Sequence, residues 1–347
     1  MGLQAKQATT AKPRKKVDKV KKCKCCRKSF RPDVANEEFC KPECKSTRQA
    51  ADKRKALEAS RLERFMKSAF AYWMATEAQR AGLLDVFCGH TVESLLELYG
   101  VYKYWLRANG LGNDAKLYAI AHVHPVKPKE GDYIGLLHAE NLFVCPELPN
   151  RQHGNNYFGQ GKSIHRSQTS AANFVSEDES RKGIIRRIVR YLGEDVITEF
   201  AKKARIQPTQ RIKRLMHLEL FLDELGLSLE QLHDCSTAKL GQLQSQLTGK
   251  KEFVRAGGSY DPLCVMRDEL ERHAKFRPDG IEEVAELAAI FYRQQCASQN
   301  VNGNIPEPVA SKIAIHMWNV LHGKEADADY VQTLMKPHLK EIEEVYF

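Results

Sequence analysis

Residues 121–153 read AHVHPVKPKEGDYIGLLHAENLFVCPELPNRQH, and the spacing of their apolar and polar residues predicts two strands joined by a turn. Residues two apart on a strand point to the same side, so we expect His122 and His124 to face one site from one strand. The Pro, Lys and Gly residues that follow favour a turn. The run LLHAENLFVC then predicts a second strand, with Asn141 at its start.

A helix is expected at the end of this stretch, where Asn150 and His153 lie three residues apart and therefore share a helical face. Imidazoles and carboxamides are the groups that a metal-dependent phosphodiesterase uses to activate water and to hold a divalent cation. The order of these residues is similar to that of an HNH finger, the ββα-metal unit of a class of nucleases. We therefore predict that His122 is the general base and that Asn141 holds the loop and orients that base.

The same likeness predicts a catalytic Mg²⁺ or Mn²⁺ held by His124, Asn150 and His153. The sequence leaves open whether His122 or His124 is the base. Many HNH fingers carry a metal ligand at the position of Ala121, which offers none; His124, expected on the same face as His122, can supply it. The alternative interpretation is a structural cluster of polar residues without catalysis.

A cysteine module precedes this stretch, because five of the ten cysteines fall between Cys23 and Cys44. The pairs Cys23-x2-Cys26 and Cys40-x3-Cys44 form two knuckles whose four thiolates suit tetrahedral zinc. The loop between them is too short for a core, so metal binding would supply most of its folding free energy, roughly 10–16 kcal/mol at neutral pH. Cys25 either replaces Cys23 or Cys26 as a ligand or is a free thiol. The sequence therefore predicts one structural zinc.

The chain has 347 residues, a formal net charge of +10 and a pI of about 9.0. A basic balance favours a polyanionic partner, nucleic acid first. Lys6 to Lys22 is almost entirely basic and small, and Lys15 and Lys16 are candidate DNA contacts; the alternative is a tail that only keeps the protein soluble. We find no apolar run long enough to span a bilayer and no apolar export segment, so we expect a cytoplasmic, nucleoid-associated protein without a membrane partner.

Composition predicts a mainly α, multi-domain chain with a small ββα-metal (HNH) finger and an N-terminal zinc module. From position 181 the pattern is helical nearly to the end, with candidate helices at 181–204, 209–225, 228–247, 261–276, 280–298, 307–322 and 325–345. The expected domains are a disordered basic arm (1–21), a four-cysteine zinc module (22–47), a helical connector (48–82), an HNH-like nuclease domain (83–180, ending in a polar loop or strap at 154–179) and a helical C-terminal domain (181–347).

Two helices of the C-terminal region carry informative stripes. Residues 181–190 pair an apolar stripe with a basic face, where Arg186, Arg187 and Arg190 are candidate phosphate contacts; the alternative is an ordinary solvated face. The apolar stripe of 280–298 is interpreted as core or as the interface of a homodimer.

Three segments of the chain resemble the NinG/Rap family of lambdoid phage recombination endonucleases. The run CKCCRKSFRPDVANEEFCKPECK from Cys23 is similar to the family's cysteine module. The run NLFVCPELPNRQHGN from Asn141, with His122 in the place of the general base, is similar to its HNH segment. The run IVRYLGEDVITEF (188–200), with Gly193 at its break, resembles the helix–Gly–helix that follows.

This resemblance spans roughly residues 20–205 with gaps, and it implies a bacteriophage or prophage endonuclease that cleaves branched DNA recombination intermediates with Mg²⁺ or Mn²⁺. The chain departs from the family where two further Cys pairs would stand: only Cys88 and Cys145 lie nearby, so a second structural zinc is not expected. Residues 206–347 have no counterpart in the resemblance.

Two functions therefore compete: a metal-dependent HNH endonuclease, and a non-catalytic, zinc-containing DNA-binding adaptor with a vestigial finger. Ala121 favours the adaptor, and His124 favours the nuclease. Two other histidines are interpreted without a function, His138 as a turn residue and His90 as a solvent-facing one.

Overall fold

The computed structural model describes residues 20–110, 117–129, 131–250, 258–277, 280–297 and 305–338. These residues are mainly helical with a few short strands, which confirms the predicted α class. The chain divides into two compact units, Met1–Arg61 and Leu62–Phe347. No helix in the described ranges combines the length and apolar character needed to cross a membrane.

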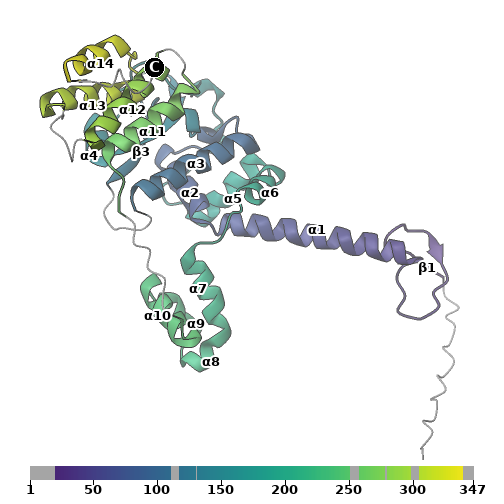
Figure 1. Ribbon diagram of the computed structural model, residues 1–347. Coiled ribbons are helices and arrows are strands. Elements are labelled where there is room, and N and C mark those ends of the chain that lie inside the picture. The colour runs from purple at the N-terminus through teal and green to yellow at the C-terminus, as the bar shows by residue number, and fades with distance from the viewer. Residues whose placement is uncertain are drawn as a thin grey trace, which may run out of the picture. The chain divides into compact units, whose positions relative to one another are not determined.

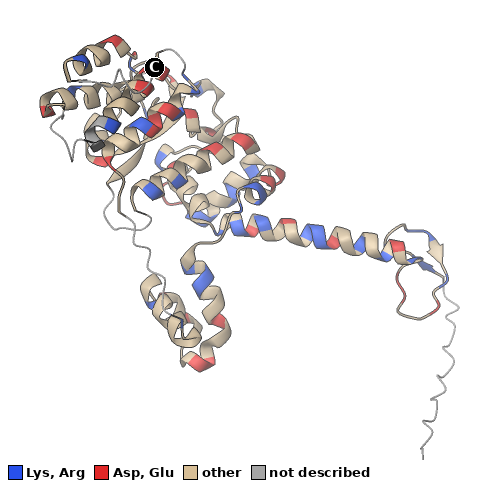
Figure 2. Ribbon diagram, viewed as in Figure 1, with Lys and Arg blue, Asp and Glu red and all other residues tan. Residues whose placement is uncertain are grey.

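The first unit contains a small knuckle followed by a solvated helix. Strands β1 (Lys21–Lys22) and β2 (Ser29–Phe30) pair antiparallel, and α1 (Pro42–Met66) follows. Lys and Arg lie along the whole of α1 (Figure 2), and Phe65 is its buried residue. Ion pairs one turn apart, such as Arg48–Asp52 at 3.1 Å, stabilise such a helix by about 0.2–0.5 kcal/mol each. The predicted helical connector (48–82) is thus helical in its first part.

The first core of the second unit lies among four helices: α2 (Ala69–Ala81), α3 (Val92–Ala108), α5 (Arg181–Leu192) and α6 (Glu194–Lys203). Local capping residues begin and end α2. Ser68 caps α2 by accepting a hydrogen bond from Ala71 N–H, and Gly82 ends it at φ 77°. Phe70, Tyr102 and Phe200 form an aromatic cluster inside, with centroids 5.4 and 5.7 Å from Phe70.

The second core lies among α11 (Pro262–Ala274), α12 (Ile281–Ala297), α13 (Glu307–Leu321) and α14 (Ala328–Met335). The stripe of α12 that was interpreted as core or dimer interface is buried here within one chain, through Ile281, Val284, Ala288 and Phe291. A third, smaller leucine cluster joins α7 (Gln210–Leu218), α8 (Leu222–Leu225), α9 (Leu229–Asp234) and α10 (Thr237–Thr248).

A two-stranded ribbon lies between the first and second cores, next to α3 and α11 (Figure 1). Strand β3 (Tyr118–His122) pairs antiparallel with β5 (Leu142–Pro146), so that Ala121 faces Phe143 and His122 faces Leu142. Leu142 and Val144 belong to the first core, whereas Ala121, Phe143 and Cys145 belong to the second. Both faces are covered, which explains why β5 is an unbroken apolar run rather than an alternating one.

Helix α4 (Glu147–His153) follows β5 directly, as predicted. The segment between β3 and β5 contains strand β4 (Tyr133–Gly135), which pairs antiparallel with β6 (Ser163–His165) in a second ribbon. The connection before β5 is more than the predicted turn, because it contains strand β4 and a 3-10 turn at Ala139–Asn141, and β5 begins at Leu142 rather than at Leu136. Strand β6 lies inside the polar stretch that was predicted as a loop or strap. Short 3-10 turns at Arg166–Gln168 and Ala171–Asn173 continue that stretch towards α5.

Candidate metal centre and His–Asn site

The four predicted zinc ligands lie together. The sulfur atoms of Cys23, Cys26, Cys40 and Cys44 lie within 4.8 Å of one another. Among the described residues, no other group of three or more Cys, His, Asp or Glu side chains brings its ligand atoms so close together. Cys23 directly follows the β1 strand, and Cys44 lies in the first turn of α1. The group does not include Cys25, so the alternative in which Cys25 replaces a ligand is not favoured. Four convergent thiols fit a structural metal such as zinc.

The thiols of this cluster have unequal proton affinities. Burial raises the pKa of Cys23, but hydrogen bonds from the backbone of Cys40, Cys26 and Cys25 outweigh it and bring that pKa down to about 6. The pKa of Cys40 is raised by its hydrogen bond with the Cys26 thiol, and the pKa of Cys44 by its hydrogen bond with Cys40. Metal binding would displace the protons that these thiols still share, so binding should weaken in acid.

Asn141 is the organising residue of the His–Asn site. Its side chain is fully buried, and Oδ1 accepts a hydrogen bond from His124 N–H at 2.8 Å. Nδ2 donates to the carbonyl oxygens of His124 at 3.1 Å and Leu136 at 2.8 Å. The carboxamide therefore holds the β3–β5 connection through the backbone of His124 and Leu136, whereas its predicted orientation of the base stays a prediction.

Two glycines allow this close packing, and the sequence analysis did not single them out. A Cβ on Gly135 would lie 1.9 Å from the carbonyl oxygen of His124. A Cβ on Gly161 would lie 2.4 Å from Asn141 Oδ1, and Gly161 also has φ 104°. Only glycine fits at either position. The glycines of these segments indicated turns, but nothing in the sequence indicated that Gly135 and Gly161 pack against His124 and Asn141.

The structure corrects the prediction for His124. Strand β3 ends at His122, so His124 lies outside the strand. The strand stops there because the Asn141 side chain, and not β5, bonds the N–H and carbonyl of His124. Pro125 also lacks the N–H that a longer ladder would need. The His124 ring is buried, with Nδ1 3.1 Å from Pro125 O, and lies 4.2 Å from the Tyr157 ring. Burial lowers the pKa of His124, and the Pro125 carbonyl partly offsets that shift.

His122 lies at the end of β3 beside α2. Both of its ring nitrogens are 3.5 Å from Nη2 of Arg80, and the same Nη2 is 2.6 Å from Glu77 Oε2. Burial first, and the Arg80 and His124 charges after it, hold the pKa of His122 well below its usual 6.5. The ring is therefore neutral at neutral pH, and its protonated form is disfavoured while Arg80 is uncompensated. Arg80 and Glu77 were not predicted to lie at this site. They precede His122 by more than forty residues, and the sequence around them shows only the spacing of a helix.

The predicted metal ligands on α4 face the other side of the ribbon. His153 lies against His322 at the end of α13, with ring centroids 4.0 Å apart, and His322 meets Phe143 edge-on at 4.7 Å. Phe143 shares the ribbon face of Ala121, opposite the face of His122. Asn150, one turn before His153 and partly buried, follows the same helical face.

The Mg²⁺ or Mn²⁺ set of His124, Asn150 and His153 stays a prediction. Ligand atoms of His122, His124 and His153 do not gather within 4.8 Å in the part of the chain that the structure describes. The His124 ring lies against Tyr157, whereas His153 lies against His322. No chemical step is therefore assigned to a metal held by His124, Asn150 and His153.

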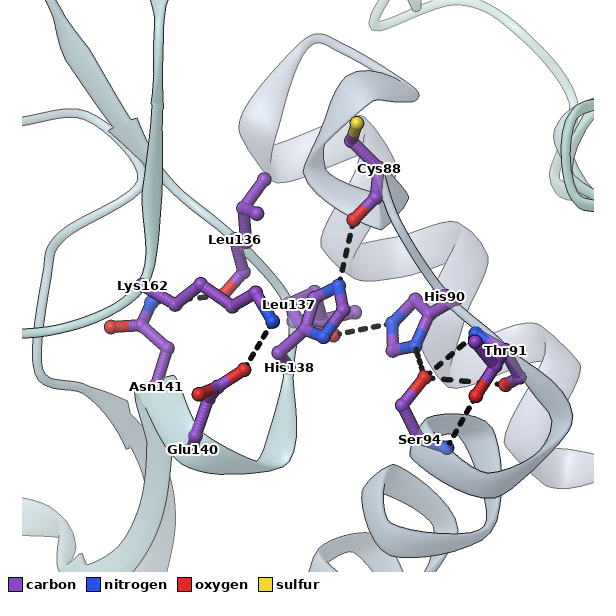
Figure 3. A network of polar contacts seen from close by, with 10 residues as sticks. All are labelled: Cys88, His90, Thr91, Ser94, Leu136, Leu137, His138, Glu140, Asn141 and Lys162. Atoms are coloured by element: carbon purple, nitrogen blue, oxygen red, sulfur yellow. Dashed lines mark hydrogen bonds and ion pairs between the residues drawn. The ribbon is translucent and has the colours of Figure 1, made fainter. Parts of the chain in front are cut away.

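His90 and His138, interpreted as solvent-facing and turn residues, instead form a stacked pair. Their rings lie 3.8 Å apart and are parallel to within 1°. Figure 3 shows their hydrogen bonds: His90 contacts Ser94 Oγ at 2.8 Å and Leu137 O at 2.9 Å, and His138 contacts Cys88 O at 2.8 Å. Burial first, then the charge of His138, lower the pKa of His90 to about 3. The pair joins the β3–β5 connection to the start of α3.

The predicted DNA contacts divide into exposed and internally bound residues. Arg186 and Arg190 are exposed on α5. Arg187 instead donates to Glu179 at 2.6 Å and to the carbonyls of Ala172 at 3.0 Å and Phe174 at 2.8 Å, so its guanidinium holds the strap against α5. Lys15 and Lys16 lie outside the described residues.

No family model, curated protein or solved structure matches this chain. The resemblance to the NinG/Rap family therefore stays a prediction made from the residues quoted above.

Proposed function

We propose that the chain is a DNA endonuclease of the HNH class with a structural zinc module, acting on branched DNA recombination intermediates. The proposal is supported by the β3–β5–α4 order, with a buried Asn141 closing the connection next to a strand-end histidine. The +10 charge supports a nucleic-acid substrate. The branched substrate comes from the NinG/Rap resemblance alone.

In this proposal His122 is the general base. Its neutral ring accepts a proton from the water that attacks the scissile phosphodiester. Arg80, with about half of its side chain exposed and its Nη2 3.5 Å from the ring, is placed to hold a phosphate oxygen. A phosphate beside Arg80 would offset the guanidinium charge and raise the pKa of His122, which makes the imidazole a better base when the substrate is bound.

The test is cleavage by the His122→Ala variant. Cleavage should fall about 10²–10⁴-fold, because the water would lose its base. DNA affinity should change little, since basic surfaces elsewhere supply it. The matched control is His165→Ala, which removes a partly exposed histidine on β6. Equal loss of cleavage in both variants, or unchanged cleavage in His122→Ala, would reject His122 as the base.

The second candidate is a non-catalytic, zinc-containing DNA-binding adaptor with a vestigial finger. One observation favours it: Ala121 offers no metal ligand. An adaptor would bind branched, duplex or single-stranded DNA without cleaving any of them in Mg²⁺ or Mn²⁺. If the wild type cleaves one of these substrates and the His122→Ala variant does not, the nuclease is supported.

A further inference from the structure

His153 and His322 each have a buried ring nitrogen that lacks a hydrogen-bond partner. Nε2 of both residues is shielded from solvent and is unpaired. His322 is only 2% exposed, and its ring centroid lies 4.0 Å from that of His153. A buried polar atom left unpaired costs about 1–3 kcal/mol, so two such atoms on touching rings indicate a missing partner.

The tautomer of His322 follows from its other nitrogen. Nδ1 lies 2.9 Å from the carbonyl oxygen of Trp318, and a carbonyl only accepts, so Nδ1 carries the proton. Nε2 then presents a lone pair. A hydrogen bond with the Asn156 backbone involves the His153 ring, and since Nε2 is unpaired, that bond is made by Nδ1. Both imidazoles therefore direct a buried lone pair from Nε2.

This arrangement is the usual one around a metal-bound histidine. A ligating imidazole commonly donates its second N–H to a backbone carbonyl, which fixes its tautomer and orientation. Trp318 and Asn156 supply such backbone partners here. Phe143 and Trp318 hold the His322 ring from two sides, with centroids at 4.7 and 4.3 Å.

The chemistry of the surroundings selects the kind of ion. Nδ1 of His322 donates to the Trp318 carbonyl, so its Nε2 is unprotonated and in the ligand form. Among the described residues, no carboxylate joins the two imidazoles in a group of ligand atoms within 4.8 Å of one another. Nitrogen donors without carboxylates suit Zn²⁺ or Co²⁺ rather than Mg²⁺, which requires oxygen ligands.

We propose that His153 and His322 bind one transition-metal ion of the zinc class through their Nε2 atoms. His322 then supplies, from the C-terminal helices, the ligand that Ala121 lacks on the same face of the ribbon. Asn150, on the same face of α4, is the candidate third donor, and water completes the coordination. Metal binding stands on the geometry alone, whereas a role of this ion in cleavage rests on the proposed function.

The test is titration of the full chain, loaded with one zinc in its cysteine module, with Co²⁺. Visible absorption distinguishes Co²⁺ bound by nitrogen and oxygen from Co²⁺ bound by thiolates, and calorimetry gives the stoichiometry. The wild type should bind one Co²⁺ with nitrogen–oxygen spectra. His153→Ala should lose this site; α4 has no buried residue, so that variant should fold. His322→Phe should also lose it, while its ring preserves the packing against Phe143 and Trp318.

The matched control is His233→Ala, which removes an exposed histidine of α9 and should retain the Co²⁺ site. Absence of the site in the wild type, or its persistence in both His153→Ala and His322→Phe, overturns the proposal and leaves a bridging water as the missing partner. Cleavage assays on the same samples separate the two proposals. Co²⁺ binding without cleavage rejects the nuclease alone, and cleavage without Co²⁺ binding rejects this site alone.

Discussion

Asn141 fixes the connection between β3 and β5 because one carboxamide satisfies three backbone groups. The donors and acceptors of His124 and Leu136 would otherwise be buried without partners in a segment that forms no ladder there. Asn141 directly precedes Leu142, which pairs with His122, so Asn141 also helps to fix the end of the strand that carries the proposed base. Residue-scale changes at this site should therefore affect stability as well as activity.

Asn141→Ala should lower the free energy of unfolding by about 2–4 kcal/mol, because it leaves several buried backbone groups unpaired at about 1–3 kcal/mol each, with partial relaxation. Urea denaturation followed by the fluorescence of the three tryptophans measures the change. The control is Asn156→Ala, an exposed position whose loss should cost no more than about 0.5 kcal/mol. A similar small cost at Asn141 would contradict its organising role.

Stability should also fall in acid. His90, His273 and His322 are held neutral by burial, with the pKa of His90 and His322 at about 3. In the unfolded chain each binds a proton near pH 6.5, so the unfolded state binds more protons below that pH. Stability present above pH 6.5 is lost as pH falls toward 3, by up to ~1.4 kcal/mol per pH unit for each histidine.

Urea denaturation at several pH values between 7.5 and 4 measures this slope. His90→Gln removes one of the histidines whose pKa is lowered in the folded chain, so its curve should be flatter than that of the wild type. If the free energy of unfolding changes equally with pH in the two proteins, His90 has the same pKa in the folded and the unfolded chain, which contradicts the prediction.

At the scale of elements, the predictable features were those with a local signal. The caps at Ser68 and Gly82, the break at Gly193 and the order of β3, β5 and α4 follow from residue types and spacing. Strand β6 was missed because its pairing with β4 is non-local and short. The His153–His322 contact was also beyond prediction, since it depends on how α13 packs against the ribbon rather than on any spacing.

The cysteine module gives a prediction at this scale. The cysteine module should retain one zinc after dialysis, and elemental analysis of Cys44→Ser should find one zinc fewer than in the wild type, because the first turn of α1 supplies that ligand. Cys25→Ser is the matched control and should retain it, since Cys25 is outside the cluster. Loss of zinc in Cys25→Ser, with retention in Cys44→Ser, would assign the ligands differently.

For the whole molecule, the exposed basic faces are the candidate source of DNA affinity. Arg186→Ala with Arg190→Ala should reduce the slope of log K against log salt by about 0.9 for each phosphate contact removed. Arg187→Ala is the informative comparison: its guanidinium is bound internally, so it should lower stability and leave the slope unchanged. Removing residues 1–21 tests the basic arm in the same assay, and an unchanged slope would assign that arm to solubility.

The central claim is that this chain hydrolyses DNA. The most direct measurement is incubation of the zinc-loaded protein with labelled four-way junction, single-stranded and duplex DNA in Mg²⁺, Mn²⁺ or Co²⁺, next to the His122→Ala variant. Cleavage of the junction by the wild type, with intact binding and about 10²–10⁴-fold less cleavage by the variant, is the predicted result. Binding of all three DNAs with cleavage of none, in any of these metals, would contradict the account and support the adaptor.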